Sequence, residues 1–133
     1  MAVHVRRGDY LLPRNAGSLG GVCTADYYRR AAAHILRHTG RPVFYVFSND
    51  MEWTRRHLDL PGRCVYVDWN TGADSWQDMM LMSRCSHAIL ANSSFSWWAG
   101  YLNDNPAKII VAPAVWIRGA ATPDIAPPGW VRL

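Results

Sequence analysis

Two consecutive arginines, Arg6 and Arg7, stand near the start of the chain, directly after a stretch that is typical of a β-strand. In residues 2–6 small or apolar side chains alternate with polar ones, and Gly8 and Asp9 form the turn that ends the strand. Ligands of open α/β sheets bind at this carboxyl end of the strands. A guanidinium stays charged and offers a planar set of donors, so an anion, phosphate first, is the expected ligand. The alternative is an ordinary surface turn in which Asp9 pairs with one arginine.

A second polar turn, Asn92-Ser93-Ser94, lies between an apolar stretch typical of a buried strand and a stretch typical of an apolar helix. Its backbone N–H groups and hydroxyls would lie at the positive end of that helix, where phosphates bind. The alternative is that Ser93 or Ser94 only caps the helix. Because two strand-end arginines are expected opposite this turn, we favour the phosphate site.

Strand-like stretches alternate with helix-like stretches along the whole chain, which predicts an α/β fold with a right-handed, three-layer, Rossmann-like parallel sheet. The order 3-2-1-4-5 would place the ends of the first and fourth strands side by side, with Arg6 and Arg7 facing residues 92–94. The expected strands are residues 2–6, 43–47, 64–67, 87–91 and 108–112, and the expected helices are 24–40, 50–58, 75–85 and 95–103.

Two segments have no regular pattern. Residues 11–22 are rich in glycine and are predicted to form a long loop. The proline-rich tail, residues 114–133, is expected to pack as a strap across a single domain that comprises residues 1–133.

Composition excludes several classes of function. The net charge is +4, but no basic run is longer than two residues, so nucleic acid is not an expected partner. Three widely spaced cysteines form no metal or redox motif, and neither a dinucleotide-binding nor a P-loop motif is present. No apolar run approaches the ~18 residues of a membrane span, and no signal peptide is expected.

Four motifs, in order, give the sequence a specific resemblance. They are His4–Tyr10 (HVRRGDY), Phe47–Trp53 (FSNDMEW), and Asp78–Cys85 (DMMLMSRC) running into Ala91–Trp98 (ANSSFSWW). The sequence strongly resembles the α-1,2-fucosyltransferases of glycosyltransferase family 11. The motifs cover nearly the whole chain.

The resemblance implies the donor-binding half of a GT-B-like enzyme that transfers fucose from GDP-fucose to a galactoside hydroxyl with inversion and without a metal or other cofactor. Arg6 is then the catalytic arginine, which holds the β-phosphate and stabilises the departing GDP. Asp78 would accept from guanine N1 and N2, although alone it is equally an ordinary first-turn carboxylate, and His4 a core histidine. The implied donor-binding residues are His4, Arg7, Asp9, Ser48, Asn49, Asp50, Asp78, Asn92, Ser93, Ser94 and Phe95. Arg7 is expected to matter less than Arg6, because strand side chains alternate between faces.

Family members carry a comparable stretch before the first motif, whereas Met1 lies only three residues ahead of it here. An alternative function is therefore a GDP-sugar-binding module without turnover. Partners beyond GDP-fucose and a galactoside glycan acceptor would be a missing amino-terminal half or a second copy, bound through the Trp-rich tail or the 11–22 loop. The expected location is the cytoplasm or membrane periphery of a bacterium, or the Golgi membrane for a fragment of a eukaryotic enzyme.

Overall fold

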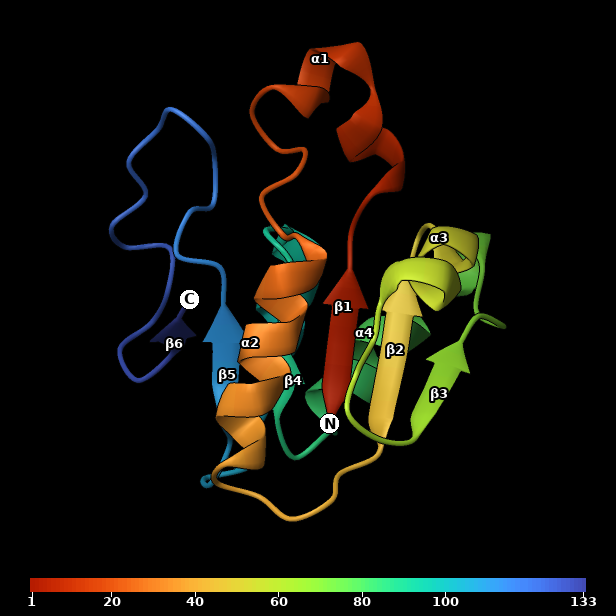
Figure 1. Cartoon of the computed structure of the whole chain (residues 1–133), viewed down its shortest axis with the longest axis vertical. Coiled ribbons are helices and arrows are strands. Elements are labelled where there is room, and N and C mark those ends of the chain that lie inside the picture. Colours follow the sequence, from red (N-terminus) through yellow and green to blue (C-terminus); the bar gives the residue numbers. More distant parts are fainter.

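Parallel strands form a single sheet in the computed structural model, which describes residues 1–133 (Figure 1). The sheet has six strands in the order β3-β2-β1-β4-β5-β6, and every neighbouring pair is parallel. The strands are β1 (Ala2–Val5), β2 (Phe44–Ser48), β3 (Cys64–Val67), β4 (Ala88–Ile89), β5 (Ile110–Ala112) and β6 (Val131–Arg132). The predicted order of the first five strands is confirmed.

The expected number of five strands is wrong, because the tail contributes a sixth. Val131 pairs with Val111 and Arg132 with Ala112, so β6 extends the sheet beside β5. Further hydrogen bonds join Leu133 N–H to the Ala112 carbonyl and Ala114 N–H to the Leu133 carbonyl. A two-residue strand is too short to show the alternation by which strands are recognised in a sequence.

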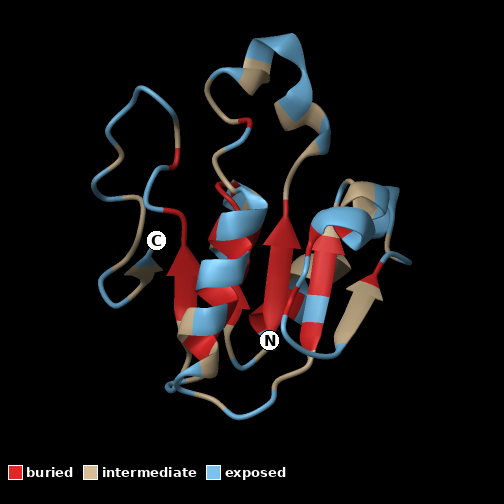
Figure 2. Cartoon of the chain, in the orientation of Figure 1, coloured by how far each residue is buried: buried red, intermediate tan, exposed pale blue.

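Two helices lie on each face of the sheet, which gives the predicted three layers. Helices α2 (Ala25–Leu36) and α3 (Met51–His57) lie on the front face in Figure 1, and α4 (Trp76–Ser83) and α5 (Ser94–Tyr101) lie behind it. Two separate apolar cores match these layers. Figure 2 shows that the central strands between them are buried.

Alternation along β1 decides which face each of its side chains reaches. Val3 and Val5 belong to the core beneath α2, whereas Ala2 belongs to the core beneath α4 and α5. His4 and Arg6 continue the Ala2 series, and they line a groove on the α4 and α5 side. The strand therefore directs its two polar side chains toward one face.

Local capping signals explain where two helices begin. The Thr24 side chain accepts a hydrogen bond from Tyr27 N–H at the start of α2, as its N-cap position predicts. The Asp50 carboxylate accepts from Trp53 N–H at 3.1 Å and starts α3 in the same way. Both expected caps are confirmed.

Residues 11–22 do not form the continuous loop that their composition predicts. A 3-10 helix, η1 (Gly8–Leu11), and a short helix, α1 (Pro13–Ala16), form an arch above β1 (Figure 1). Pro13 stands at the first position of α1, where its missing N–H costs nothing. The arch is attached to the rest of the protein through Asn92, whose Nδ2 donates to the Leu19 carbonyl at 3.2 Å.

The tail packs against α5 before it forms β6. Trp97 Nε1 donates to the Ile125 carbonyl at 2.6 Å, and the Trp97 and Trp130 rings lie 5.8 Å apart. Among the helices, none is both apolar enough and long enough to cross a lipid bilayer.

Candidate functional site

A polar groove of about 450 Å³ lies at the carboxyl ends of β1, β2 and β3, beside the starts of α4 and α5. Six of the residues singled out from the sequence line this groove: His4, Arg6, Ser48, Asn49, Asp78 and Phe95. Strands β1 and β2 and the helices on one face of the sheet thus bring together side chains that are up to 91 positions apart (95 − 4) in the sequence.

Arg6 lies in the groove with its hydrogen-bonding capacity unused. Its Nε is 2.9 Å from Asp9 Oδ1, the separation of an ion pair, and its guanidinium lies 5.6 Å from the centre of the Tyr10 ring. The Asp9 oxygen is not in line with the Nε–H bond, so the buried Nε has no hydrogen-bond partner. Arg6 is therefore held by charge, and its N–H groups remain available to an anion.

His4 lies beside Arg6 on the same face of β1. It is only 4% exposed, its ring centre is 5.6 Å from that of Phe95, and its Nδ1 has no hydrogen-bond partner. Burial, and secondarily the charge of Arg6, lower the pKa of His4 to about 3. His4 is thus a neutral ring in the groove at physiological pH.

His4 Nδ1 and Arg6 Nε are the only two buried side-chain nitrogen or oxygen atoms in the chain without a hydrogen-bond partner. Such atoms are rare in folded proteins, because each one loses its bond to water without replacement. Both line the same groove. A polar ligand there would supply the missing partners.

Asp78 faces the groove from the first turn of α4. Its Oδ1 accepts a hydrogen bond from Asn70 Nδ2 at 2.7 Å. Burial raises the pKa of Asp78, and the Asn70 hydrogen bond partly opposes this shift. Asn70 orients the carboxylate while leaving Oδ2 without a protein hydrogen bond.

Arg7 and Asp50 are not brought into the groove. Arg7 points to the opposite face of the sheet, where its guanidinium lies 3.7 Å from the Trp53 ring centre and its Nε is 3.3 Å from Asp50 Oδ2. Asp50 also caps α3. The expectation that both arginines face residues 92–94 is therefore wrong for Arg7.

The Asn92 side chain is fully used within the protein. Its Nδ2 donates to the carbonyls of Leu19 and Trp116 at 3.2 and 3.0 Å, and its Oδ1 accepts from the Cys23 thiol at 3.6 Å. Asn92 is 2% exposed and does not line the groove. It joins the 8–23 segment to β4 and to the tail.

Ser93 and Ser94 lie at the start of α5 but are not lining residues of the groove. Ser93 stands at the N-cap position, yet its side chain makes no capping hydrogen bond. Ser94 is exposed. The capping alternative for Ser93 is thus wrong, whereas the proposed phosphate contacts stay a prediction.

Asn49 joins the end of β2 to the arginine turn, which is the turn of residues 6–9 after β1. Its Oδ1 accepts from Arg7 N–H at 2.9 Å, and its Nδ2 donates to Asp9 Oδ1 at 3.3 Å. A Cβ on Gly8 would overlap the Asn49 amide nitrogen, so this approach requires glycine. Asp9 itself is not a lining residue.

Sequence reasoning missed a whole side of the groove. The turn after β3 and the start of α4 contribute Asp68, Asn70, Thr71, Gly72 and Ser75. The polar turn Asp68–Gly72 at the carboxyl end of a parallel strand was the available signal, because ligand-binding residues gather at that edge. Nowhere in the chain do three His, Cys, Asp or Glu side chains form a cluster that could hold a metal ion.

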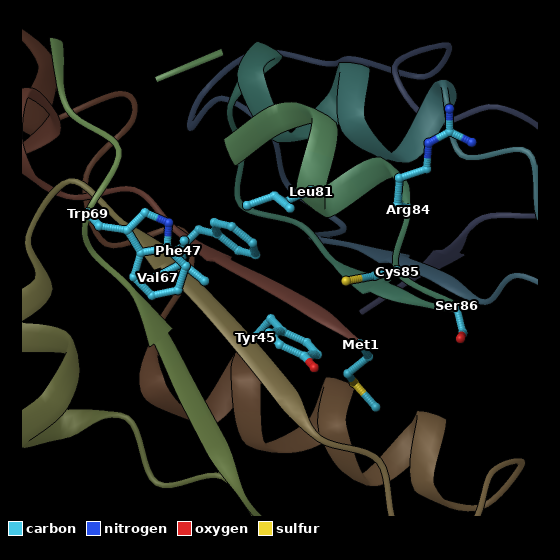
Figure 3. A pocket seen from close by; sticks show the side chains of 9 residues that line it. All are labelled: Met1, Tyr45, Phe47, Val67, Trp69, Leu81, Arg84, Cys85 and Ser86. Carbon is cyan, nitrogen blue, oxygen red and sulfur yellow. The ribbon is translucent and has the colours of Figure 1, made fainter. Parts of the chain in front are cut away.

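A second groove, of about 420 Å³, continues from the first along the sheet (Figure 3). It shares Phe47 and Val67 with the polar groove but is lined mainly by apolar side chains, including Tyr45, Trp69 and Leu81. Figure 3 shows that it lies between β2, β3 and α4, on the face opposite α2. It has no hydrogen-bonding or charged cluster, so the polar groove is the candidate site.

Comparison with known proteins gives consistent results. The family model "Glycosyl transferase family 11" matches residues 1–133. The chain is 35% identical over 132 residues to the O-antigen biosynthesis glycosyltransferase WbnK of Escherichia coli, covering 99% of this chain and 44% of that protein. It is 35% identical over 136 residues to an alpha-1,2-colitosyltransferase of Escherichia coli, covering 100% of this chain and 47% of that protein.

A primate protein is similar over a shorter stretch. The galactoside alpha-(1,2)-fucosyltransferase 1 of Ateles belzebuth is 38% identical over 103 residues, covering 77% of this chain and 28% of that protein. No solved structure matches. The chain spans just under half the length of the two bacterial relatives. Because the family model matches every residue, the chain belongs to glycosyltransferase family 11.

Proposed function

We propose that this chain is the donor-binding part of a galactoside α-1,2-fucosyltransferase, which transfers fucose from GDP-fucose to a galactoside hydroxyl with inversion. Its three-layer sheet would be one half of a GT-B-like fold. The names of the relatives support a sugar transferase that forms an α-1,2 linkage. They also show that the transferred sugar differs within the family, so the choice of fucose is a more specific proposal than sugar transfer itself.

The observation that carries the proposal is the Arg6 guanidinium at the carboxyl end of the central strand, which lines the groove and whose buried Nε has no hydrogen-bond partner. Breaking the bond between the sugar and the β-phosphate leaves negative charge on GDP. A hydrogen-bond donor of the protein that already lies where this charge develops lowers the activation barrier. Loss of one such hydrogen-bond donor typically costs about 10²–10³-fold in rate. In this proposal Arg6 binds the β-phosphate, and its positive charge stabilises the negative charge on the departing GDP without a metal.

The base would bind further along the groove. Asp78, held by Asn70, has Oδ2 available to accept from guanine N1 and N2, and adenine offers no such pair of donors at that edge. The Phe95 ring provides an apolar surface beside His4. Ser48, which lines the groove, would hold a ribose or sugar hydroxyl.

Calorimetry with GDP tests the proposal directly. The chain should bind GDP, and Arg6→Ala should abolish detectable binding while the far-ultraviolet circular dichroism stays unchanged, since a charge-assisted phosphate contact is worth roughly 1.5–3 kcal/mol or more. Arg29→Ala is the matched control, because Arg29 is 70% exposed and pairs only with Asp26 on α2. GDP affinity that survives Arg6→Ala would contradict the role of Arg6. Equal affinity for ADP and GDP would contradict the role of Asp78.

A further inference from the structure

We infer that Asn49 is a positioning residue, which aims the Arg6 guanidinium into the groove through Asp9 instead of contacting the donor itself. The inference rests on the proposed function, because it concerns how the phosphate-binding arginine is held. It assigns to Asn49 a different task from the hydroxyl contact that the sequence suggests.

The first step of the argument is the chain of contacts from β2 to Arg6. Asn49 Nδ2 donates to Asp9 Oδ1 at 3.3 Å, and the same Asp9 oxygen lies 2.9 Å from Arg6 Nε. The carboxylate therefore sits against the Nε side of the guanidinium. No protein group hydrogen-bonds to the two terminal nitrogens of Arg6, which leaves them for a phosphate.

The second step is that Asn49 also fixes the backbone of the turn. Its Oδ1 accepts from Arg7 N–H at 2.9 Å, so one side chain makes two hydrogen bonds to the turn. This task needs an acceptor and a donor on the same short side chain, which an amide provides and a carboxylate does not. Gly8 allows the close approach, because any Cβ there would overlap the amide.

The third step is that hydrogen bonds fix the residues on both sides of Asn49. On one side of it, Ser48 Oγ accepts from Asp50 N–H at 3.0 Å, and on the other, Asp50 caps α3. Asp50 also pairs with Arg7 on the opposite face of the sheet. The end of β2 thus holds the end of β1 from both faces, and only the Asn49 side leads to Arg6.

GDP titration of two variants tests the inference. Asn49→Ala should raise the dissociation constant for GDP by roughly tenfold, because the Asp9 carboxylate that orients the Arg6 guanidinium is no longer held by Asn49. Asn105→Ala is the matched control: it also removes two amide hydrogen bonds, to Ser86 and Ala107, but at a distant loop. It should change GDP affinity by less than twofold.

Asn49→Asp supplies a readout that a merely structural residue would not give. At pH 8 a carboxylate at this position repels Asp9, and GDP binding should be weaker than in Asn49→Ala. Two adjacent carboxylates share a proton readily, and a protonated one donates a hydrogen bond to the other. Between pH 8 and pH 5 the affinity of Asn49→Asp, taken relative to the unchanged protein at each pH, should therefore recover, whereas the ratio for Asn49→Ala should stay constant.

The outcomes separate the two hypotheses. If the unchanged protein does not bind GDP, the proposed function fails. If it binds GDP and Asn49→Ala binds equally well, the positioning role is overturned while the proposed function stands. Should Asn49→Ala not fold, the pH dependence of Asn49→Asp decides, and a ratio that does not change between pH 8 and pH 5 overturns the role.

Discussion

Individual residues at the groove carry chemical consequences, and His4 gives the clearest one. Its pKa falls from 6.5 to about 3 on folding, so the folded protein binds fewer protons than the unfolded chain between these values. The contribution of neutral His4 to the free energy of unfolding is complete above pH 6.5 and is lost as the pH falls toward 3. Within this window each pH unit removes up to about 1.4 kcal/mol of stability.

We predict that His4→Gln flattens this part of the pH dependence, because the variant has no proton to gain. Urea unfolding at pH 7, 6, 5 and 4 measures the free energy of unfolding of both proteins. The difference between them should change steadily below pH 6.5. A difference that is constant from pH 7 to pH 4 would rule out the buried, neutral state of His4.

Arg7 stabilises the fold and does not face the groove. Arg7→Ala removes its ion pair with Asp50 and its contact with Trp53, both partly buried. We expect a loss of roughly 1–2 kcal/mol of stability. GDP affinity should fall much less than in Arg6→Ala, and thermal melting alongside GDP calorimetry distinguishes the two arginines. A variant with full stability and no GDP binding would reverse this assignment.

At the scale of elements, the arch above β1, the end of β4 and the tail meet at Asn92. Asn92→Ala would leave the Leu19 and Trp116 carbonyls without their donor. The expected cost is about 2–4 kcal/mol, measured as a shift in the urea midpoint. Asn105→Ala, at a more exposed loop, should cost less. Equal costs would show that Asn92 does not carry the connection between these segments.

Elements with strong local signals were predictable. Continuous apolar runs marked β2 and β3, and the side-chain caps Thr24 and Asp50 marked the starts of α2 and α3. Helix α1 and strand β6 have four and two residues, too few for any periodic pattern. Their positions depend on contacts with distant segments, such as the pairing of β6 with β5.

The residues of the site also divide into those that the sequence predicted and those that it did not. Residue type and a strand end were sufficient to find Arg6, whereas His4 and Asp78 were singled out through the family resemblance. The role of Asn49 was not predictable, because its hydrogen bonds join residues 40 and 42 positions apart. Asn92 was assigned to the ligand because it stands in the polar turn at the start of a helix, yet its side-chain amide donates to buried carbonyls.

At the scale of the whole molecule, the groove that we propose as the GDP-fucose site contains few groups that could activate an acceptor hydroxyl. Of its lining carboxylates, Asp68 pairs with Arg55 and Asp78 is bound by Asn70. We predict that this chain alone binds GDP but transfers fucose slowly or not at all. GDP release from GDP-fucose, with and without lactose, measures this. Rapid lactose-dependent release would show that these residues suffice for catalysis.

Exposed aromatic side chains lie on the outer helices, on β2 and in the turn after β3, and exposed aliphatic side chains lie on the arch and the tail. Trp98 and Tyr101 on α5 are 48% and 54% exposed, and Trp76 on α4 is 60% exposed. Apolar area of this kind favours association. We expect sedimentation to show concentration-dependent self-association, reduced in the double variant Trp98→Glu/Tyr101→Glu. Purely monomeric behaviour at every concentration would contradict this expectation.

The stack behind the arginine turn has an optical consequence. The Trp53 indole contacts both the Arg7 guanidinium, 3.7 Å from its ring centre, and the His57 imidazole, whose ring centre is 4.7 Å away and whose plane is inclined by only 10°. None of the other tryptophans has a cation over its ring. A charge close to an indole ring perturbs its emission, so the fluorescence of Trp53 depends on the position of Arg7. The protein therefore contains its own fluorophore for following, in real time, whether the turn that holds Arg6 moves when the groove is filled.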